Sequence, residues 1–489
     1  MAHALEFPPV SRPLLRPGET CWRIERADRV ALLVDGAAYF SAAKAALLKA
    51  RRSILLLGWD FDPRTRLSPD VDDPRGDDTV GALLLRLQKE RDLDIRLLIW
   101  DMALPLAARH EFYPQRARGL FRQTGVRFVL DRGRSFGACQ HQKVLVVDDQ
   151  IAFCGSADFA PNRWDTPEHD DDNPHRKLPS GRPYPPRHEL VLMVEGPAAK
   201  ALADLARERW VEATGQRPVA FGDGRSPDYW PADVVPDLRD VPVAIARTLP
   251  PWRGQSGVRD NQRLYLEAIA SARRLIYLEN QYFTSSSIGA ALAARLAEPE
   301  GPEIVLVCSR HSPGLTDALT MDRARDALIQ HLRQADRFGR FNAYAPHTRG
   351  GNVVIVHSKL AVFDDRLLRV GSTNLNNRSM GYDTECDLAI EAPAGPAGEP
   401  VRRGIAAVTC GLIAHHLGRG PERLAEQMRA GGLAAAIEAL DAAPHRRLRP
   451  LVAVSLGPIG SLLAERHLGD PFELSDAWRP WRRRSAVRR

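Results

Sequence analysis

Apolar positions along this chain follow two regular spacings. Alanine and leucine recur at helical spacing over residues 41–53 and 263–274, and each of these segments leads into an apolar run typical of a strand. Helical spacing returns at 80–92 and 288–299, again before an apolar run. Strands that alternate with helices in this way predict α/β layers, in which helices cover both faces of each sheet.

The pattern occurs twice, in the same order. Four segments have counterparts 196–222 residues further along the chain: 50–61 with 272–283, 94–101 with 303–310, 141–156 with 357–372, and 188–198 with 384–394. Chance similarity between apolar strands explains one such match but not four. The chain is therefore predicted to be a duplicated α/β unit.

Composition divides the chain further. The first unit is expected at 20–213 and the second at 261–395, joined by residues 214–260, which are rich in proline, glycine and aspartate. Residues 396–489 are expected to form a helical C-terminal extension that ends in a basic tail. The expected fold is thus two tandem pseudo-symmetric α/β units, each a mixed β-sheet flanked by helices, with the active site at their interface.

One repeated strand carries the same polar pattern in both halves. The pattern is His, any residue, Lys, four residues, Asp and, six residues later, Gly-Ser; a buried strand by itself needs none of these. Side chains alternate along a strand, so the His and the Lys of each copy face the same space. The matched residues are His141, Lys143, Asp148, Gly155 and Ser156 in the first half, and His357, Lys359, Asp364, Gly371 and Ser372 in the second.

A histidine and a lysine directed into one space suit a phosphodiester. The lysine neutralises a phosphoryl oxygen, and a neutral imidazole attacks phosphorus. One histidine cannot be nucleophile and leaving-group acid in the same step, so we expect the two halves to bring both histidines to one site. Two lysines balance the charge, and we therefore expect no metal and no other cofactor. Because the duplication assembles both histidines within one chain, a monomer suffices for catalysis.

The remaining motif positions have supporting roles. Glu189 and Glu385 occupy matching positions at strand starts and are our candidates to orient the histidines; which glutamate serves which histidine stays open. Asp148 and Asp364 lie at the far end of the motif strand, where a turn-capping carboxylate is expected. We include all four residues in the catalytic set.

The two Gly-Ser pairs supply further contacts. Glycine allows a close approach of the backbone, and the hydroxyl groups of Ser156 and Ser372 are available to a developing oxyanion. Both serines are therefore candidate phosphate-binding residues.

The motifs resemble the phospholipase D superfamily, in the class with two HKD motifs on one chain. Residues 151–165 (IAFCGSADFAPNRWD) and 371–385 (GSTNLNNRSMGYDTE) are similar to the first-half and second-half segments of phospholipase D proper. Residues 277–283 (YLENQYF) are similar to the family's Tyr-x-Glu-Asn-Gln-Phe-Phe segment. The resemblance extends over residues 20–395.

The resemblance implies a phospholipase D-like fold and an enzyme that hydrolyses or transphosphatidylates phospholipids through a phosphohistidine intermediate. It implies these roles: His141 as nucleophile, His357 as general acid and base, Lys143 and Lys359 as phosphate ligands, and Asn374 as a phosphate-pocket residue. The first-half counterpart of Asn374 is Asp158, an acid that is not expected to bind phosphate directly.

Other polar and aromatic residues have two interpretations each. Residues 279–281 either line the pocket or serve packing. Trp59, Trp100 and Trp164 either line an acyl cleft or pack in the core. The insertion at 165–186, with the acidic run EHDDDNPH, is expected to be a solvated surface loop rather than a metal site.

Charge and composition bear on partners and location. A net charge of +7 favours anionic partners such as a phospholipid surface, and the Arg- and Trp-rich tail at 478–489 either binds anionic headgroups or is a solvated tail. The six cysteines form no CxxC pair, which favours free thiols in a reducing compartment. No apolar run reaches about 18 residues and no signal peptide is recognised, so we expect a cytoplasmic protein with peripheral membrane contact.

Two other enzyme classes and a scaffold remain as alternatives. The basic charge also fits a nuclease or another phosphodiesterase, although nucleases of this superfamily are often short chains that carry one motif and dimerise; nucleic acid is therefore the less favoured partner. A cardiolipin-synthase-type phosphatidyl transferase would use glycerol or a second lipid as acceptor. A non-catalytic membrane scaffold does not need intact His and Lys at both motifs.

Overall fold

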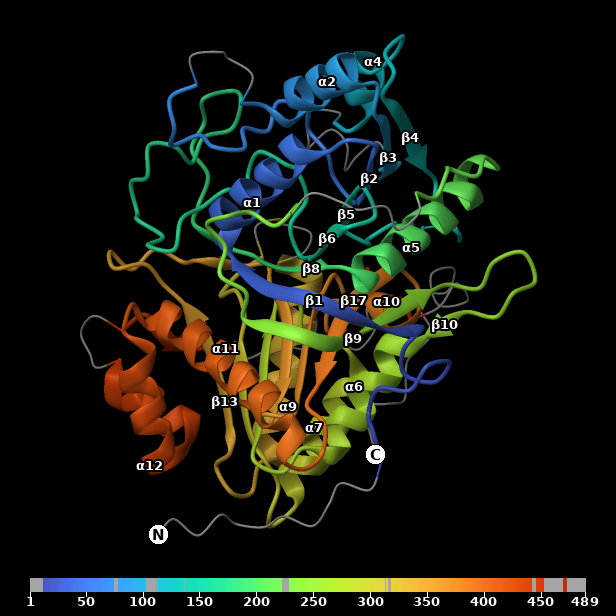
Figure 1. Cartoon of the computed structure of the whole chain (residues 1–489). Coiled ribbons are helices and arrows are strands. Elements are labelled where there is room, and N and C mark those ends of the chain that lie inside the picture. The colour runs from blue at the N-terminus through green and yellow to red at the C-terminus, as the bar shows by residue number, and fades with distance from the viewer. Residues whose placement is uncertain are drawn as a thin grey trace.

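Two β-sheets organise the computed structural model, one large and one small. The described residues are 12–73, 78–102, 111, 113–135, 137–221, 228–312, 314, 318–441, 446–452 and 469–472. The large sheet runs through both halves of the molecule (Figure 1). Its first-half strands are β1 (Arg23–Val34), β2 (Ser53–Gly58), β3 (Asp94–Trp100), β4 (Arg127–Asp131), β5 (Val144–Val147), β6 (Ile151–Gly155) and β8 (Leu190–Glu195).

The second half supplies the rest of the large sheet. Its strands are β9 (Leu238–Leu249), β10 (Val258–Arg259), β11 (Leu275–Asn280), β12 (Glu303–Val307), β13 (Phe341–Pro346), β15 (Lys359–Phe363), β16 (Leu367–Gly371), β17 (Glu385–Glu391) and β18 (Leu448–Pro450). The small sheet is a parallel pair of β7 (Arg187–His188) and β14 (Ile355–Val356), one strand from each half.

The strand order shows the duplication directly. From one edge it runs β4-β3-β2-β5-β6-β8-β1, and from the other, after the terminal β18, it runs β13-β12-β11-β15-β16-β17-β9. β1 and β9 meet antiparallel at the centre, with Val30 opposite Leu238. Each half mixes parallel pairs (β2 with β3, β11 with β12) and antiparallel pairs. The predicted α/β fold with mixed sheets is confirmed.

The segment expected to connect the two units contains β9. This strand occupies the place in the second half that β1 occupies in the first, and it pairs with β17 as β1 pairs with β8. We propose that the second unit begins with β9, so that the connector is shorter than residues 214–260. Proline, glycine and aspartate are concentrated on both sides of β9 within residues 214–260, and they obscure the strand-like run LRDVPVAIARTL.

Helices cover both faces of the sheet in each half (Figure 1). In the first half α1 and α2 pack on one face and α5 on the other; in the second half α6, α7 and α9 pack on one face and α11 and α12 on the other. The helices are α1 (Asp35–Lys49), α2 (Val80–Arg91), α4 (Gln115–Leu120), α5 (Pro197–Thr214), α6 (Asp260–Ser271), α7 (Ser286–Ala297), α9 (Arg323–Ala335), α10 (Asn377–Gly381), α11 (Glu399–Leu417) and α12 (Pro421–Leu440), with short turns at Ala318–Asp322 and Pro396–Gly398.

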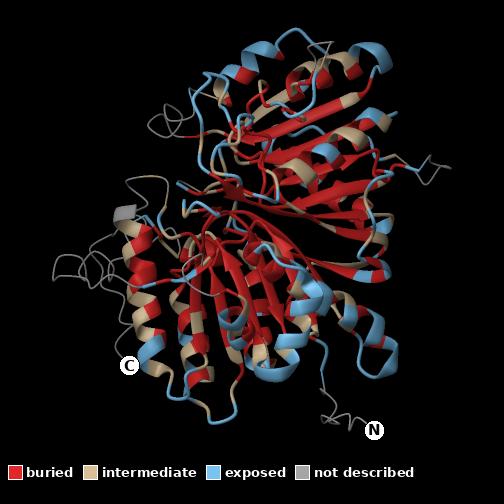
Figure 2. Ribbon diagram, turned by 90° about the vertical axis from the view of Figure 1, so that its left-hand side faces the viewer, coloured by how far each residue is buried: buried red, intermediate tan, exposed pale blue. Residues whose placement is uncertain are grey.

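This double covering explains the apolar runs in the sequence. Every residue of β2 is buried, with Ile54 and Leu56 in the core beneath α1 and α2, and Leu55 and Leu57 in the core beneath α5. Burying one leucine side chain stabilises a fold by roughly 1.5–3 kcal/mol. Figure 2 shows that burial concentrates along the strands of both halves, which makes the sheet a rigid base for side chains at its strand ends.

The insertion at 165–186 is only partly the solvated loop that its composition predicts. Asp165, His169 and Arg176 are buried, and Arg176 Nη1 lies 3.0 Å from Asp165 Oδ1. Glu168 and Asp170 nearby are exposed, as predicted. The prediction failed for the buried residues because their charges compensate one another, which local composition does not reveal.

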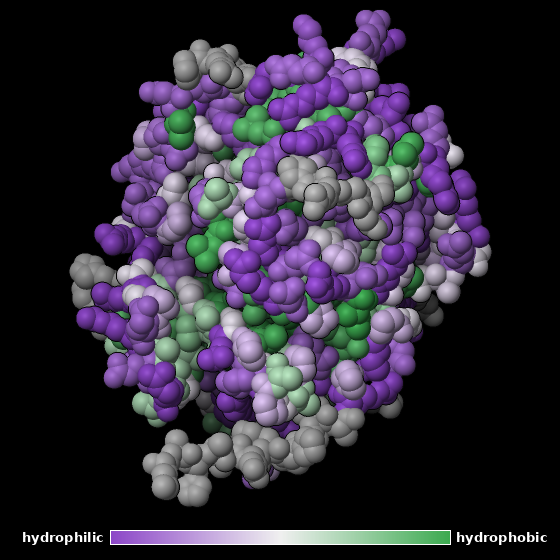
Figure 3. All heavy atoms as spheres, viewed as in Figure 1, coloured by the Kyte–Doolittle hydropathy of each residue, from purple (hydrophilic) through white to green (hydrophobic). Residues whose placement is uncertain are grey.

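The helices and the surface bear on membrane contact. Among the described residues, none of the helices is apolar and long enough to cross a bilayer. The face in Figure 3 is mostly hydrophilic, with scattered hydrophobic residues. All six cysteines are free thiols. The Arg- and Trp-rich tail at 478–489 lies outside the described residues.

Candidate active site

Each histidine motif begins on backbone that is held by the opposite half. His141 N donates to Thr384 O at 3.0 Å, and His357 N donates to His188 O at 2.8 Å. Thr384 and His188 immediately precede Glu385 and Glu189 in the chain. The exchange therefore places each motif histidine beside the glutamate of the other half.

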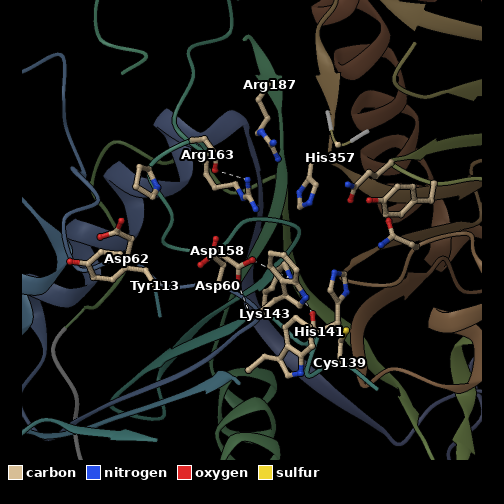
Figure 4. Close-up of a pocket in the computed structure, with 18 of the residues that line it drawn as sticks. Asp60, Asp62, Tyr113, Cys139, His141, Lys143, Asp158, Arg163, Arg187 and His357 are labelled. Carbon is tan, nitrogen blue, oxygen red and sulfur yellow. Dashed lines mark hydrogen bonds and ion pairs between the residues drawn. The ribbon is translucent and has the colours of Figure 1, made fainter. Parts of the chain in front are cut away.

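The two motif histidines line one cavity between the halves. Its volume is about 880 Å³, and Lys143 and Asn374 also line it. Figure 4 shows His141 and His357 at this cavity, with two arginines on the His357 side and Lys143 on the His141 side. Imidazoles supplied by segments more than 200 residues apart thus share one space large enough for a phosphodiester and its substituents.

The glutamates contact the histidines in a crossed arrangement. His141 Nδ1 lies 2.9 Å from Glu385 Oε2, and His357 Nδ1 lies 2.8 Å from Glu189 Oε2. Both carboxylates are completely buried. A carboxylate on Nδ1 holds the proton there and leaves Nε2 of each ring with its lone pair for chemistry.

Ser156 and Ser372 lie behind the glutamates instead of at the cavity. Ser156 Oγ donates to Glu189 Oε2 at 2.5 Å, and Ser372 Oγ donates to Glu385 Oε2 at the same distance. Both serines are completely buried. The predicted contact with phosphate is not what the structure shows, because strand direction turns both hydroxyls toward the carboxylates. They position the glutamates that position the histidines.

Asp148 and Asp364 lie away from the cavity and cap neighbouring strands. Asp148 accepts hydrogen bonds from the backbone N–H groups of residues 51–53, at 2.6–2.8 Å. Asp364 accepts the equivalent bonds from the backbone N–H groups of residues 273–275, and the shortest bond to each group is 2.7–3.0 Å long. Each aspartate thus fixes the start of β2 or β11, the strand next to its own motif strand, and touches no cavity residue.

This placement predicts a loss of stability rather than of chemistry when Asp364 is replaced. Asp364→Ala removes a charged acceptor from three N–H groups, and we expect the free energy of unfolding to fall by about 2 kcal/mol. The matched control is Asp365→Ala, which breaks only a surface ion pair with Arg274 and should cost less than about 1 kcal/mol. Denaturant unfolding measures both; a variant of normal stability with kcat reduced more than about 100-fold would contradict the placement.

The motif lysines have unequal surroundings. Lys143 Nζ lies 3.3 Å from Asp158 Oδ2 and lines the cavity. Lys359 is more deeply buried, and its Nζ donates to Gln281 Oε1 at 3.1 Å and to the carbonyl of His357 at 2.6 Å. Gln281 thus stands between Lys359 and the cavity, while Asp158 offsets the charge of Lys143.

Asn374 is poised toward the cavity. Its side chain is buried, and Oδ1 has no hydrogen-bond partner among the described residues. Buried polar atoms are normally paired, so an unpaired amide oxygen at a cavity wall indicates a place where a ligand can donate a hydrogen bond.

Burial and neighbouring cations favour the neutral form of both motif histidines. Burial lowers the pKa of both His141 and His357 well below the usual 6.5. The ammonium of Lys143 and then that of Lys359 lower the pKa of His141 further. Burial also lowers the pKa of Lys359 and raises the pKa of Glu385. A bound phosphate anion would offset these effects, because its negative charge stabilises protonated forms nearby.

Two arginines distinguish the two sides of the cavity. Arg163 Nε and Arg187 Nη1 lie 3.6 Å and 3.5 Å from Glu189 Oε1, and both arginines line the cavity. They also lower the pKa of His357, after burial and Lys359. On the other side, Asp383 and Asp158 partly counteract the cations around His141. The site is pseudo-symmetric in shape and asymmetric in charge.

Sequence reasoning overlooked both arginines. Arg163 lies within the segment 151–165. Arg187 lies two residues before Glu189, and this spacing places the side chains of Arg187 and Glu189 on one face of a strand. That spacing was a usable signal. It was weak because Asp383 occupies the matching position in the second half, so comparison of the repeats does not single out Arg187.

Some of the residues for which the sequence allowed either cavity lining or packing line the cavity, and the others pack in the core. Gln281 lines the cavity, whereas Glu279 and Asn280 are completely buried outside its lining. Trp59 and Trp100 line the cavity and stack on each other with ring centroids 5.6 Å apart. Trp164 packs in the core beneath α1.

Comparison with known proteins points to one family. The family profile described as "Phospholipase D" matches residues 46–293, about half of the chain, and the profile described as "Cardiolipin synthase, PLD-like domain" matches residues 265–399. Phospholipase D alpha 1 of Carica papaya is 23% identical over an alignment that covers 71% of this chain and 59% of the relative. Phospholipase D beta 2 of Arabidopsis thaliana is 24% identical, with 71% and 52% covered.

The chain therefore spans between half and three fifths of these relatives. Among solved structures, the phosphatidylserine synthase of Haemophilus influenzae has a TM-score of 0.52 and 13% identity, with 83% of this chain and 94% of that protein covered. At this identity the likeness concerns the fold alone, and it agrees with the large mixed sheet described above.

Proposed function

The chain belongs to the phospholipase D superfamily, and we propose that it is a phosphodiesterase that cleaves the headgroup from a phospholipid and passes the phosphatidyl group to water or to an alcohol. The observation that carries the proposal is the meeting of His141 and His357 at one cavity, each with a buried glutamate on Nδ1. Two oriented imidazoles on one phosphorus are what a two-step displacement requires.

In the first step Nε2 of His141 attacks phosphorus. The bond between phosphorus and the headgroup oxygen breaks, and that oxygen takes the proton from Nε2 of His357. The product is a phosphatidyl group on His141 and a free alcohol. Lys143 and the Nδ2–H group of Asn374, two residues that line the cavity, donate to the non-bridging oxygens and stabilise their charge.

In the second step His357, now neutral, removes a proton from water or an alcohol. The resulting oxygen attacks phosphorus, and the bond to Nε2 of His141 breaks. Phosphatidic acid or a new phosphatidyl ester leaves, and His357 is again protonated. The phosphatidyl group waits for an acceptor between the steps, so one site serves both hydrolysis and transfer.

The charge asymmetry supports this division of roles. A histidine nucleophile becomes positively charged when it binds phosphorus, and Asp158 and Asp383 act on the side of His141. Arg163 and Arg187 make the His357 imidazolium a stronger acid, because they disfavour its positive charge. Both effects lower the barrier to the first step.

The cavity also suits a cationic headgroup. Trp59, Trp100 and Tyr113 line it together with the carboxylates of Asp60 and Asp383. Aromatic faces and carboxylates attract quaternary or primary ammonium groups, and cation–π contacts contribute about 0.5–2 kcal/mol each. We therefore propose phosphatidylcholine or phosphatidylethanolamine as the substrate class.

One assay tests the function. The protein is incubated with phosphatidylcholine vesicles and ethanol, and lipids are separated by thin-layer chromatography. We expect phosphatidic acid without ethanol and phosphatidylethanol with it, because the phosphohistidine accepts either nucleophile. Single- and double-stranded DNA are the comparison substrates. Cleavage of DNA with no conversion of phosphatidylcholine or phosphatidylethanolamine would contradict the proposal in favour of a nuclease.

The second-half profile favours one alternative, a transferase of the cardiolipin-synthase type. Such an enzyme gives little product with water and needs a lipid or glycerol acceptor. Replacing ethanol by phosphatidylglycerol as the only phospholipid distinguishes the two: formation of cardiolipin in preference to phosphatidic acid supports the alternative.

A further inference from the structure

A second group of ionisable side chains is buried outside the catalytic cavity. It lies where the start of α1, the 165–186 insertion and the end of α11 meet. None of its members lines the cavity. We name it the histidine cluster; its members are Asp35, His169, His188, Glu279, His415 and His416.

Three atoms of the cluster converge at the spacing of metal ligands. His169 Nε2 and His415 Nε2 are 3.3 Å apart, and Asp35 Oδ2 lies 3.2 Å from His415 Nε2 and 3.6 Å from His169 Nε2. Ligand bonds of about 2.0–2.1 Å in a tetrahedral site set neighbouring ligand atoms about 3.3 Å apart. The same 3.3 Å spacing fits a hydrogen bond between the two imidazole nitrogens when one of them carries a proton, and a bound ion would take the place of that proton.

The atoms behind these ligands orient them. His169 Nδ1 lies 2.9 Å from Asp165 Oδ2, so the carboxylate holds the proton on Nδ1 and leaves the Nε2 lone pair directed at the site. Metal-bound histidines characteristically have such a carboxylate partner.

Asp35 supplies an independent indication. Its side chain is completely buried, Oδ1 lies 2.8 Å from His188 Nδ1, and Oδ2 has no hydrogen-bond partner among the described residues. A buried carboxylate oxygen that accepts no hydrogen bond is costly, and Oδ2 has only the two imidazoles at ion-pair distance. A cation between Oδ2 and the two imidazoles removes that cost.

The other cluster members form an outer layer. His188 contacts carboxylates at both ring nitrogens, with Nε2 2.9 Å from Glu279 Oε2, and so has no free lone pair. His416 Nε2 lies 3.1 Å from Glu279 Oε1, and Ser358 Oγ donates to Glu279 Oε2 at 2.8 Å. Ser358 stands between His357 and Lys359, so the outer layer reaches the back of the catalytic motif.

We propose that Asp35, His169 and His415 bind a divalent transition-metal ion of the zinc type. Two imidazoles and one carboxylate favour such an ion over calcium or magnesium, which prefer oxygen ligands alone. The ion would join three parts of the chain: α1, the insertion and α11. It touches none of the reacting atoms, so the two-step chemistry needs no metal.

The site has a structural consequence for catalysis. Asp35 N donates to the carbonyl of Glu189 at 2.8 Å, and Glu189 orients His357. Fixing Asp35 thus fixes the glutamate's backbone. The acidic run around His169 has the composition of a solvated loop. Its partners Asp35 and His415 lie too far away in the chain for a local pattern to show them.

Metal titration of the full-length protein tests the site. The protein is stripped with a chelator, dialysed and titrated with Zn²⁺ by calorimetry, and bound zinc is counted by elemental analysis. We expect one ion per chain in the wild type. His169→Ala and His415→Ala should weaken binding on the order of 100-fold or more, because loss of an outer partner alone already costs about 10–100-fold.

Two control variants locate the ion. His175→Ala replaces an exposed histidine of the same insertion, and His141→Asn replaces a histidine of the catalytic cavity. Both should bind zinc as the wild type does. A wild type that binds no zinc, or zinc lost with His141→Asn but kept with His169→Ala, would overturn the proposal.

A measurement on the wild type keeps the test valid if a variant fails to fold. X-ray absorption of the zinc-loaded protein should show imidazole scattering at about 2.0–2.1 Å and no sulfur ligand. Zinc should also raise the midpoint of thermal unfolding by several degrees, because the ion binds only the folded chain. A sulfur ligand at about 2.3 Å would assign the ion to cysteines and refute the site.

Discussion

Replacing His141 by asparagine is expected to reduce kcat on phosphatidylcholine by at least about 10⁴-fold, because loss of a nucleophile removes the covalent route altogether. Asparagine has a similar polar outline but no nitrogen lone pair that can attack phosphorus. His357→Asn should cause a loss of similar size with this substrate, because a choline alkoxide does not leave without a proton. Release of choline, followed by a coupled assay, measures both.

The control for these variants is His331→Asn, which replaces a partly exposed histidine of α9 that does not line the cavity. It should retain wild-type kcat. Unfolding curves of all three variants show whether a loss of activity reflects a loss of fold. A well-folded His141→Asn protein with more than about a hundredth of wild-type kcat would exclude His141 as the nucleophile.

The crossed glutamates provide the second large effect. Glu385→Gln and Glu189→Gln should each lower kcat roughly 10²–10⁴-fold, because an amide no longer stabilises the imidazolium or holds its tautomer. The two variants should fail at different steps. Glu385 contacts His141, so Glu385→Gln should slow formation of the phosphohistidine; Glu189 contacts His357, so Glu189→Gln should slow headgroup protonation and the attack by water.

A p-nitrophenyl ester of phosphatidic acid separates these steps, since nitrophenolate leaves without a proton. With it, Glu385→Gln should lose the rapid release of the first nitrophenolate. Glu189→Gln should keep that first release and lose the later turnovers. The reverse result would mean that each glutamate serves the histidine of its own half, contrary to the 2.8–2.9 Å contacts.

The sequence predicted structure best for the motifs that occur in both halves of the chain. The two His-x-Lys strands and the matching apolar runs predicted the duplicated α/β fold, and strand alternation predicted that His141 and Lys143 face one space. Both side chains do line the cavity. Asp148 and Asp364, expected to cap a turn, bind the start of a neighbouring strand instead. Their position was predictable, but their bonding partners are about 90 residues or more away.

What the sequence left open depends on contacts between the halves. Glu189 reaches His357 through the parallel pairing of β7 with β14, and Glu385 reaches His141 through a bridge between Gln140 and Thr384. Both pairings are too short to leave a pattern in the sequence. Ser156 and Ser372 were assigned to phosphate because the direction of a hydroxyl depends on which neighbour lies behind the strand. The histidine cluster draws on α1, an insertion and α11, so that only the folded chain brings its members together.

The central claim is that two imidazoles from different halves act in succession on one phosphorus. Pre-steady-state release of nitrophenolate from the p-nitrophenyl ester tests it most directly in the two histidine variants. The account predicts that His357→Asn releases one nitrophenolate per chain and then stalls, with the phosphatidyl group found on His141 by mass spectrometry, while His141→Asn releases none. A first-turnover release from His141→Asn, or a stalled adduct on any other residue, would contradict it.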